Sequence, residues 1–185
     1  MAALDRLSLP AAALTRRRLL EAGALVVGFS FVPATVRAQA TAGAQRALPL
    51  DAVDSFLAVR ADGTVVVHSG KVDLGTGHRI AMRQMVGEEL DLAVERIELI
   101  EGDTALTPNQ GPTAGSTGVM RGGVELRQAA ATAREALLAL AAERLQRPAN
   151  EFALADGQVR AADGRSVAFA MLLGGRGFDV RMNPK

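Results

Sequence analysis

Two glycine-rich segments carry the residue types of this sequence that could bind a ligand. Residues 73–78 read Asp-Leu-Gly-Thr-Gly-His, and residues 109–118 read Asn-Gln-Gly-Pro-Thr-Ala-Gly-Ser-Thr-Gly. Glycine lets a backbone come close to a ligand, and a helix that begins behind such a loop offers unpaired N–H groups to an anion. Together the two loops predict one site for a polyanionic ligand.

The small and polar members of the two loops are the candidate binding residues. They are Gly75, Thr76, Gly77, His78, Thr113, Ala114, Gly115, Ser116 and Thr117. Each loop alone also fits a plainer role, since the first can be a turn and the second can be mobile or can cap a helix. The loops are neither a P-loop, because Gly-Lys-Thr is absent, nor a dinucleotide fingerprint, because Gly-x-Gly-x-x-Gly fails at Ile80.

The composition excludes several other kinds of chemistry. The chain has 185 residues and no cysteine, so it cannot hold a disulfide or a cysteine-ligated zinc ion or iron–sulfur cluster. Its two histidines, His68 and His78, cannot form a three-histidine metal site. A net charge of +1 argues against a nucleic-acid or anionic-membrane surface. His68 is expected in a strand, and His78 is either a ligand contact or, more commonly for its position, a helix cap or surface residue.

The pattern of apolar residues predicts a chain of alternating strands and helices. Strands are expected at 55–60, 64–69 and 96–101, helices at 78–90 and 124–146, and a small β annex with a short helix over 152–173. Gly87 inside the first helix costs about 1 kcal/mol relative to alanine, unless another part of the chain packs closely there. Residues 102–123 are expected to form a long loop. The predicted fold class is α+β, with short β-hairpins and strands and two main helices.

The first forty residues have the pattern of an export signal. Arg16, Arg17 and Arg18 directly precede an apolar run over residues 22–32, and Ala38-Gln39-Ala40 offers small residues for cleavage. The run is shorter than the ~20 residues needed to span a bilayer. We therefore expect a twin-arginine signal peptide over 1–40 and export to the periplasm, with a short membrane anchor or an ordinary secretory signal as the alternative. The remaining expected divisions are a linker at 41–52, a domain at 53–175 and, from 176 to 185, the start of a linker to further domains.

Four stretches together resemble a known family. These are residues 69–78, the strand at 96–100, Gly102-Asp103-Thr104, and the loop at 112–117. In order and spacing they are similar to the molybdopterin-binding region of the xanthine dehydrogenase and aldehyde oxidase family. Within it, the likeness is to the large subunits of bacterial isoquinoline 1-oxidoreductases or periplasmic aldehyde dehydrogenases.

The resemblance implies a cofactor and a partner. The cofactor is molybdopterin, in its cytosine dinucleotide form, and the partner is a small [2Fe-2S] subunit that removes electrons. The implied reaction oxidises an aldehyde or an N-heterocycle with water as the oxygen source. In relatives the loop matching 113–117 lines the pterin and its phosphates, while Thr76 stands where relatives usually have glutamine. The chain is then the N-terminal fragment of a larger subunit and is expected to hold no stoichiometric cofactor alone.

No catalytic residue is carried over from the resemblance. The family's catalytic glutamate lies beyond the length of this chain. The glutamates of the first helix and the next strand are expected to be solvated: Glu88, Glu89, Glu95, Glu98 and Glu101. Two other functions remain open, a periplasmic structural or binding domain and a truncated, non-catalytic fragment.

Overall fold

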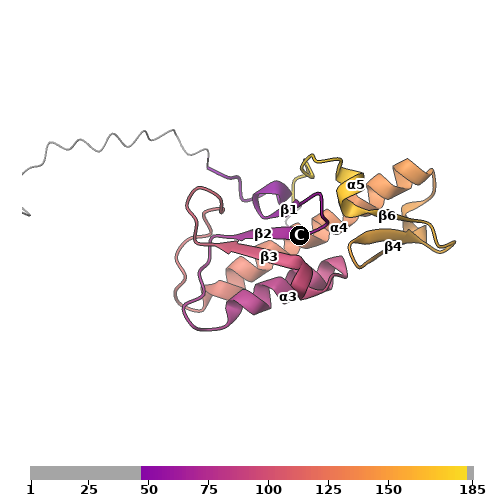
Figure 1. Cartoon of the computed structure of the whole chain (residues 1–185). Coiled ribbons are helices and arrows are strands. Elements are labelled where there is room, and N and C mark those ends of the chain that lie inside the picture. Colours follow the sequence, from indigo (N-terminus) through magenta and orange to yellow (C-terminus); the bar gives the residue numbers. More distant parts are fainter. Residues whose placement is uncertain (1–46, 183–185) are drawn as a thin grey trace, which may run out of the picture. The chain divides into compact units, whose positions relative to one another are not determined.

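The computed structural model describes residues 47–182, so the predicted signal peptide at 1–40 lies outside the described residues. Two three-stranded sheets and two long helices make up the described part (Figure 1). The strands and α-helices are β1 (Leu57–Val59), β2 (Val65–Ser69), α3 (His78–Leu90), β3 (Ile97–Glu101), α4 (Val124–Leu145), β4 (Phe152–Ala155), β5 (Gln158–Ala161), β6 (Ser166–Ala168) and α5 (Phe169–Leu173). The predicted α+β class is confirmed.

The first sheet has the order β1-β2-β3. Strand β1 pairs antiparallel with β2, and β2 pairs parallel with β3 after a crossover through α3. Val65 is paired with Ile97, and Val67 with Leu57, so these side chains share one face of the sheet. That face is buried in the hydrophobic core with residues of both long helices.

The two long helices pack against each other and close this core. Helix α3 contributes Met82, Val86 and Leu90, which recur every four residues and are buried. Helix α4 contributes a stripe of small and branched residues: Leu126, Ala129, Ala130, Ala133, Leu137 and Ala141. A Cβ on Gly87 would lie 2.6 Å from the carbonyl oxygen of Leu92, so the chain that follows the helix packs closely on this position and requires glycine there.

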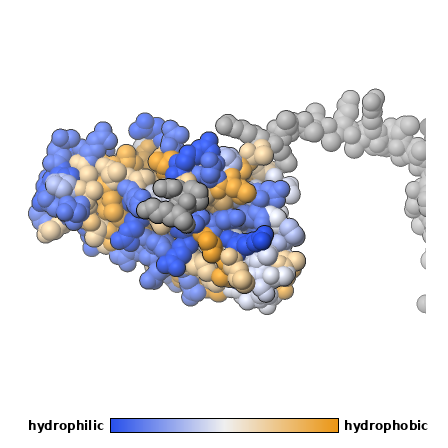
Figure 2. Space-filling view, turned by 180° about the vertical axis from the view of Figure 1, so that it is seen from behind, coloured by the Kyte–Doolittle hydropathy of each residue, from blue (hydrophilic) through white to orange (hydrophobic). Residues whose placement is uncertain are grey.

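The second sheet is an antiparallel annex built from β4, β5 and β6. Its turn at Asp156-Gly157 has both residues at positive φ, as a tight hairpin requires. Phe152, Leu154 and Val159 bury one side of the annex against the core. Seen from behind the view of Figure 1, the surface of the molecule shows hydrophobic residues in separate patches between hydrophilic ones (Figure 2).

Two predicted boundaries are wrong. The strand expected at 55–60 covers only Leu57–Val59, because Val53–Ser55 form a 3-10 turn (η1) in which Phe56 N–H donates to Val53 O at 2.9 Å. The loop expected at 102–123 ends early, because Gly118–Gly123 form a turn of π-helix (η3) that runs directly into α4. Gly122 and Gly123 are buried there, and their missing side chains leave room for those of Lys71 and Met85.

The ends of the described chain are tied to each other. Val53 N–H donates to Val180 O at 3.1 Å, and the Asp54 carboxylate accepts from the amides of Phe178 and Asp179 at 2.6 and 2.9 Å. Residues 178–180 of the second predicted linker are therefore attached to the domain, and Asp51 and Ala52 of the first pair with residues 181–182, while the domain boundaries themselves stay predictions. Between residues 47 and 182, no helix combines the length and the hydrophobicity needed to cross a membrane.

Candidate functional site

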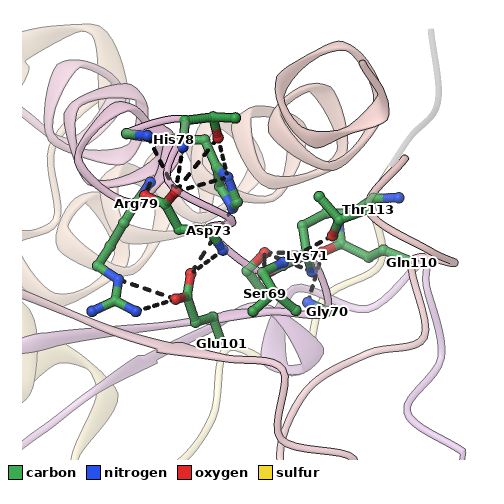
Figure 3. Close-up of polar contacts among 12 residues, drawn as sticks. Ser69, Gly70, Lys71, Asp73, His78, Arg79, Glu101, Gln110 and Thr113 are labelled. Carbon is green, nitrogen blue, oxygen red and sulfur yellow. Dashed lines mark hydrogen bonds and ion pairs between the residues drawn. The ribbon is translucent and has the colours of Figure 1, made fainter. Parts of the chain in front are cut away.

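The first glycine-rich loop is organised by the carboxylate of Asp73 (Figure 3). One oxygen accepts the backbone N–H groups of Gly75, Thr76 and Gly77 at 2.9, 2.9 and 3.1 Å, and the other accepts that of Arg79 at 3.2 Å. The chain thus supplies its own anion to the N-terminus of α3. The expectation that these amides are unpaired and available to a ligand is wrong for this loop.

The same contacts explain the ionisation of Asp73. The N–H of Arg79 makes the largest contribution, and those of Gly75, Gly77 and Thr76 add to it, so the pKa of the carboxyl group lies below its usual value. Asp73 therefore remains negatively charged, which disfavours a second anion at this loop.

His78 is buried, with 5% of its side chain exposed, so it is neither a surface residue nor a side-chain cap. Its Nδ1 lies 3.2 Å from the hydroxyl of Thr76. Its Nε2 lies 3.9 Å from a carboxylate oxygen of Glu101 and has no hydrogen-bond partner among the described residues. The imidazole packs under the loop and separates two carboxylates, those of Asp73 and Glu101.

Glu101 corrects the expectation of five solvated glutamates. Only 8% of its side chain is exposed, because it forms an ion pair with Arg79 and accepts the N–H of Asp73 at 3.3 Å. Glu89 is also largely covered, at 18% exposed, where it pairs with Arg127 at 2.7 Å. Glu98 remains half-exposed, and Glu88 and Glu95 are exposed, as expected.

The second loop is held against the end of β2 by side chains that the sequence pattern did not single out. Lys71 Nζ donates to the carbonyl oxygens of Gly111 and Pro112, and Gln110 Oε1 accepts the N–H of Gly70 at 2.8 Å. Thr113, which was predicted, accepts the N–H of Val72 through its hydroxyl at 2.9 Å. Lys71 lies two residues before the first segment and Gln110 lies inside the second, but nothing in their spacing distinguishes a buried hydrogen-bonding residue from a surface residue.

A hollow of about 490 Å³ lies between the two loops. Seven of the nine predicted residues line it: Thr76, Gly77, His78, Thr113, Ala114, Ser116 and Thr117. Gly75 and Gly115 belong to the same loops but are not part of its lining. The volume falls within the roughly 300–1,000 Å³ of small-molecule sites. Ala81 and residues 118–120 complete the wall, so η3 contributes to the site as well.

The two walls of the hollow differ in their electrostatics. The lining contains no carboxylate, lysine or arginine. Behind the first loop lies the negative charge of Asp73, and behind the second lies the positive charge of Lys71, whose Nζ is 3.3 Å from the hydroxyl of Thr117. Gly77 and Gly115 both have positive φ, and a Cβ added to either would meet nothing within 4 Å, so the backbone is accessible at one point of each loop.

A larger and more open depression of about 840 Å³ lies elsewhere, at the C-terminal end of α3. Its lining includes three acidic residues, Glu88, Asp91 and Asp156, and the basic residue Arg160. It contains none of the predicted binding residues and remains apart from the two loops.

Comparison with known protein families matches residues 9–180 to the molybdopterin cofactor-binding domain. The chain belongs to this family. Among curated proteins, the chain is 43% identical over 127 residues to a nicotinate dehydrogenase subunit of Pseudomonas putida. It is also 31% identical over 116 residues to a protein of Escherichia coli named "Probable hypoxanthine oxidase XdhD". These matches cover 69% and 62% of this chain, but only 11% and 12% of the relatives.

Solved structures show the same fold. Quinoline 2-oxidoreductase from Pseudomonas putida 86 matches with a TM-score of 0.55 and 24% identity, over 64% of this chain and 15% of that chain. The CO dehydrogenase of Oligotropha carboxidovorans matches with a TM-score of 0.57 and 18% identity, over 69% of this chain and 18% of that chain. The chain spans about a tenth of the length of the curated relatives it matches.

Proposed function

We propose that this chain is the N-terminal part of the large, molybdopterin-binding subunit of a molybdenum hydroxylase, and that the hollow forms part of its cofactor site. The observation that carries the proposal is the meeting of the two glycine-rich loops at one hollow, within a chain that belongs to the molybdopterin cofactor-binding family. The role of the nine loop residues in binding stays part of this proposal.

The residues of the hollow fit a flat, polar ring system that carries phosphate. Gly77 and Gly115 leave space beside the backbone, and Thr113, Ser116 and Thr117 place hydroxyl groups around it. His78 adds a buried imidazole whose Nδ1 side reaches Thr76 and Gly118. Because Asp73 is negatively charged, the phosphate is expected on the side of the second loop, away from the first.

The residues that line the hollow indicate which functions this chain contributes to the proposed enzyme and which belong to the cofactor or to the rest of the subunit. When bound, the cofactor supplies the two-electron oxidation of an aldehyde or N-heterocycle, with oxygen from water. The lining of the hollow contains no carboxylate, so a glutamate base is not among its residues, and we assign to them the binding and orientation of the cofactor. The base is expected in the remainder of the larger subunit.

Three finer statements belong to the same proposal. The cofactor is the cytosine dinucleotide form, the electron acceptor is a small [2Fe-2S] subunit, and the mature protein is periplasmic. Two of the relatives, one of nicotinate dehydrogenase and one of a 6-hydroxypseudooxynicotine dehydrogenase complex, are named as subunits, which supports assembly with partner chains. The pattern Arg16-Arg17-Arg18 before an apolar run supports export through the twin-arginine route.

Metal and nucleotide analysis of the complete subunit, purified with its partners, tests this proposal. We expect one molybdenum per large subunit and one cytidine monophosphate released by acid hydrolysis, whereas the 185-residue chain alone should hold less than a tenth of an equivalent. Ala114→Glu places a carboxylate in the hollow and should lower the molybdenum content of the complete subunit at least tenfold. Ala139→Glu, on the exposed side of α4, is the matched control and should retain it.

The alternative is a structural or binding domain without redox chemistry, favoured by the way Asp73 already occupies the amides of the first loop. A complete subunit that folds and assembles but contains no molybdenum would establish this alternative. Retention of molybdenum in Ala114→Glu would show that the cofactor lies elsewhere in the subunit.

A further inference from the structure

Lys71 is a buried cation without an acidic partner. Its residue is 1% exposed, and no carboxylate oxygen of the described residues lies within 4 Å of its Nζ. Its three hydrogen bonds go to neutral oxygens of the second loop: Gly111 O at 3.3 Å, Pro112 O at 2.8 Å and Thr117 Oγ1 at 3.3 Å. Burying an ammonium group is costly unless all its donors are satisfied, so these three contacts are what keeps Lys71 inside.

The position of the ammonium decides which way the loop's peptide groups face. All peptide bonds of the described chain are trans, so each N–H points opposite to the preceding C=O. Because Pro112 O is turned toward Lys71, the N–H of Thr113 points away from it. Ala114 O likewise accepts two hydrogen bonds from Thr117, one from its N–H at 3.1 Å and one from its hydroxyl at 2.7 Å. The N–H of Gly115 therefore points away from Thr117.

The stem of Lys71 fits a space that only glycine leaves. A Cβ on Gly122 would lie 2.5 Å from Cγ of Lys71 and 3.4 Å from its Cε. The aliphatic chain therefore packs directly on the backbone of η3, and the side chain is held along its whole length.

We infer that Lys71 is the positioning residue of the ligand site: its buried ammonium holds Pro112 O and, through the hydroxyl of Thr117, the turn at Ala114, and so presents the amides of Thr113 and Gly115 to a bound anion. This inference rests on the proposed function for the identity of the ligand. The positioning itself concerns only residues of this chain and can be measured without the cofactor.

The experiment uses the fact that the chain has no cysteine of its own. Lys71→Met removes the ammonium and keeps the stem. Lys71→Cys, alkylated with bromoethylamine in denaturant and refolded, restores an ammonium at the length of lysine. Arg121→Met removes an exposed positive charge from the neighbouring η3 and is the matched control.

Amide-resolved hydrogen exchange by NMR reports the order of the loop. The two reporters are the N–H of Val72, bonded to Thr113, and the N–H of Thr117, bonded to Ala114. We expect Lys71→Met to raise their exchange at least tenfold relative to the amides of α4, the aminoethylated variant to restore it, and Arg121→Met to leave it unchanged. Unchanged exchange in Lys71→Met, or failure of the aminoethyl group to restore it in a folded protein, would overturn the inference.

Titration with inorganic pyrophosphate separates this inference from the proposed function. In the native chain we expect the amide signals of Thr113 and Gly115 to shift, with at least tenfold weaker binding in Lys71→Met and recovery after aminoethylation. If Lys71 controls loop exchange but pyrophosphate shifts neither amide of the native chain, the positioning role stands and the proposed anion site is contradicted.

Discussion

Gly70→Ala provides the sharpest test of how the second loop is attached to β2. A Cβ at this position would lie 2.0 Å from the carbonyl oxygen of Pro108 and 3.0 Å from the backbone nitrogen of Gln110. Both are backbone atoms, so the loop must move by about 1 Å to reach normal contact. That movement also strains the 2.8 Å hydrogen bond from Gly70 N–H to the Gln110 side chain.

The expected loss of stability follows from these contacts. Overpacking costs about 1–3 kcal/mol and a lost hydrogen bond about 1 kcal/mol, while the reduced freedom of the unfolded chain returns about 0.4–1 kcal/mol. We therefore expect a net loss of about 1–3.5 kcal/mol, or a Tm lower by about 3–10 °C at roughly 3 °C per kcal/mol for a domain of this size. Differential scanning calorimetry and urea denaturation measure both quantities.

Gly118→Ala is the matched control for Gly70→Ala. Its Cβ would lie 3.9 Å from the imidazole of His78, which is ordinary van der Waals contact, and the unfolded chain changes in the same way. With no clash to offset it, the reduced freedom of the unfolded chain should raise its Tm by about 1–3 °C, which corresponds to about 0.4–1 kcal/mol. Equal Tm values for the two variants would refute the argument that the clash with Pro108 and Gln110 determines the effect.

Two further predictions concern the core and the response to acid. Leu137→Ala, at a fully buried position of α4, should lower the free energy of unfolding by about 2–5 kcal/mol in urea denaturation, whereas Leu138→Ala on the partly buried side should cost less. The hydrogen bond from the Arg79 N–H is the largest cause that lowers the pKa of Asp73, and the hydrogen bond from the Arg165 side chain lowers the pKa of Asp163 to about 2. The ionised forms of both carboxylates therefore stabilise the fold above pH 3.8, and this stabilisation is lost as the pH falls toward 2. The double variant Asp73→Asn, Asp163→Asn should thus have a flatter dependence of unfolding free energy on pH between about 5 and 2, and a slope equal to the native one would contradict this.

The hydrophobic pattern predicted the framework of the fold because the core follows simple periodicities. Met82, Val86 and Leu90 recur at helical spacing and are buried, and the β-branched run of β2 lies in a strand. The boundaries failed where long-range contacts decide the local structure. The turn at Val53–Ser55 depends on hydrogen bonds to residues 178–180, which no local pattern indicates.

The two loops were located correctly as neighbours of one hollow, but their internal chemistry was not foreseen. Glycines and hydroxyl residues indicate where a backbone can approach a ligand, so seven of the nine predicted residues line the hollow. The direction of the Asp73 carboxylate decides which backbone N–H groups of the first loop remain available to a ligand. That direction depends on the rotamer of Asp73 and on the geometry of the turn. The sequence contains the aspartate but does not specify that it folds back onto the helix that follows it.

The segment around the end of β2 explains why the buried roles of Lys71 and Asp73 were not predicted from the sequence, and it also indicates that these residues are important. Ser69, Lys71 and Asp73 alternate along the chain and all turn toward hydrogen-bond partners, while Val72 and Leu74 between and after them are 37% and 70% exposed. This is the reverse of the usual arrangement, in which apolar side chains point inward and polar ones outward. Such an inversion lowers stability unless every buried polar group is paired, and here the partners come from the two loops that form the hollow. The exception to the hydrophobic pattern therefore coincides with the proposed ligand site, where a local departure from folding rules is expected.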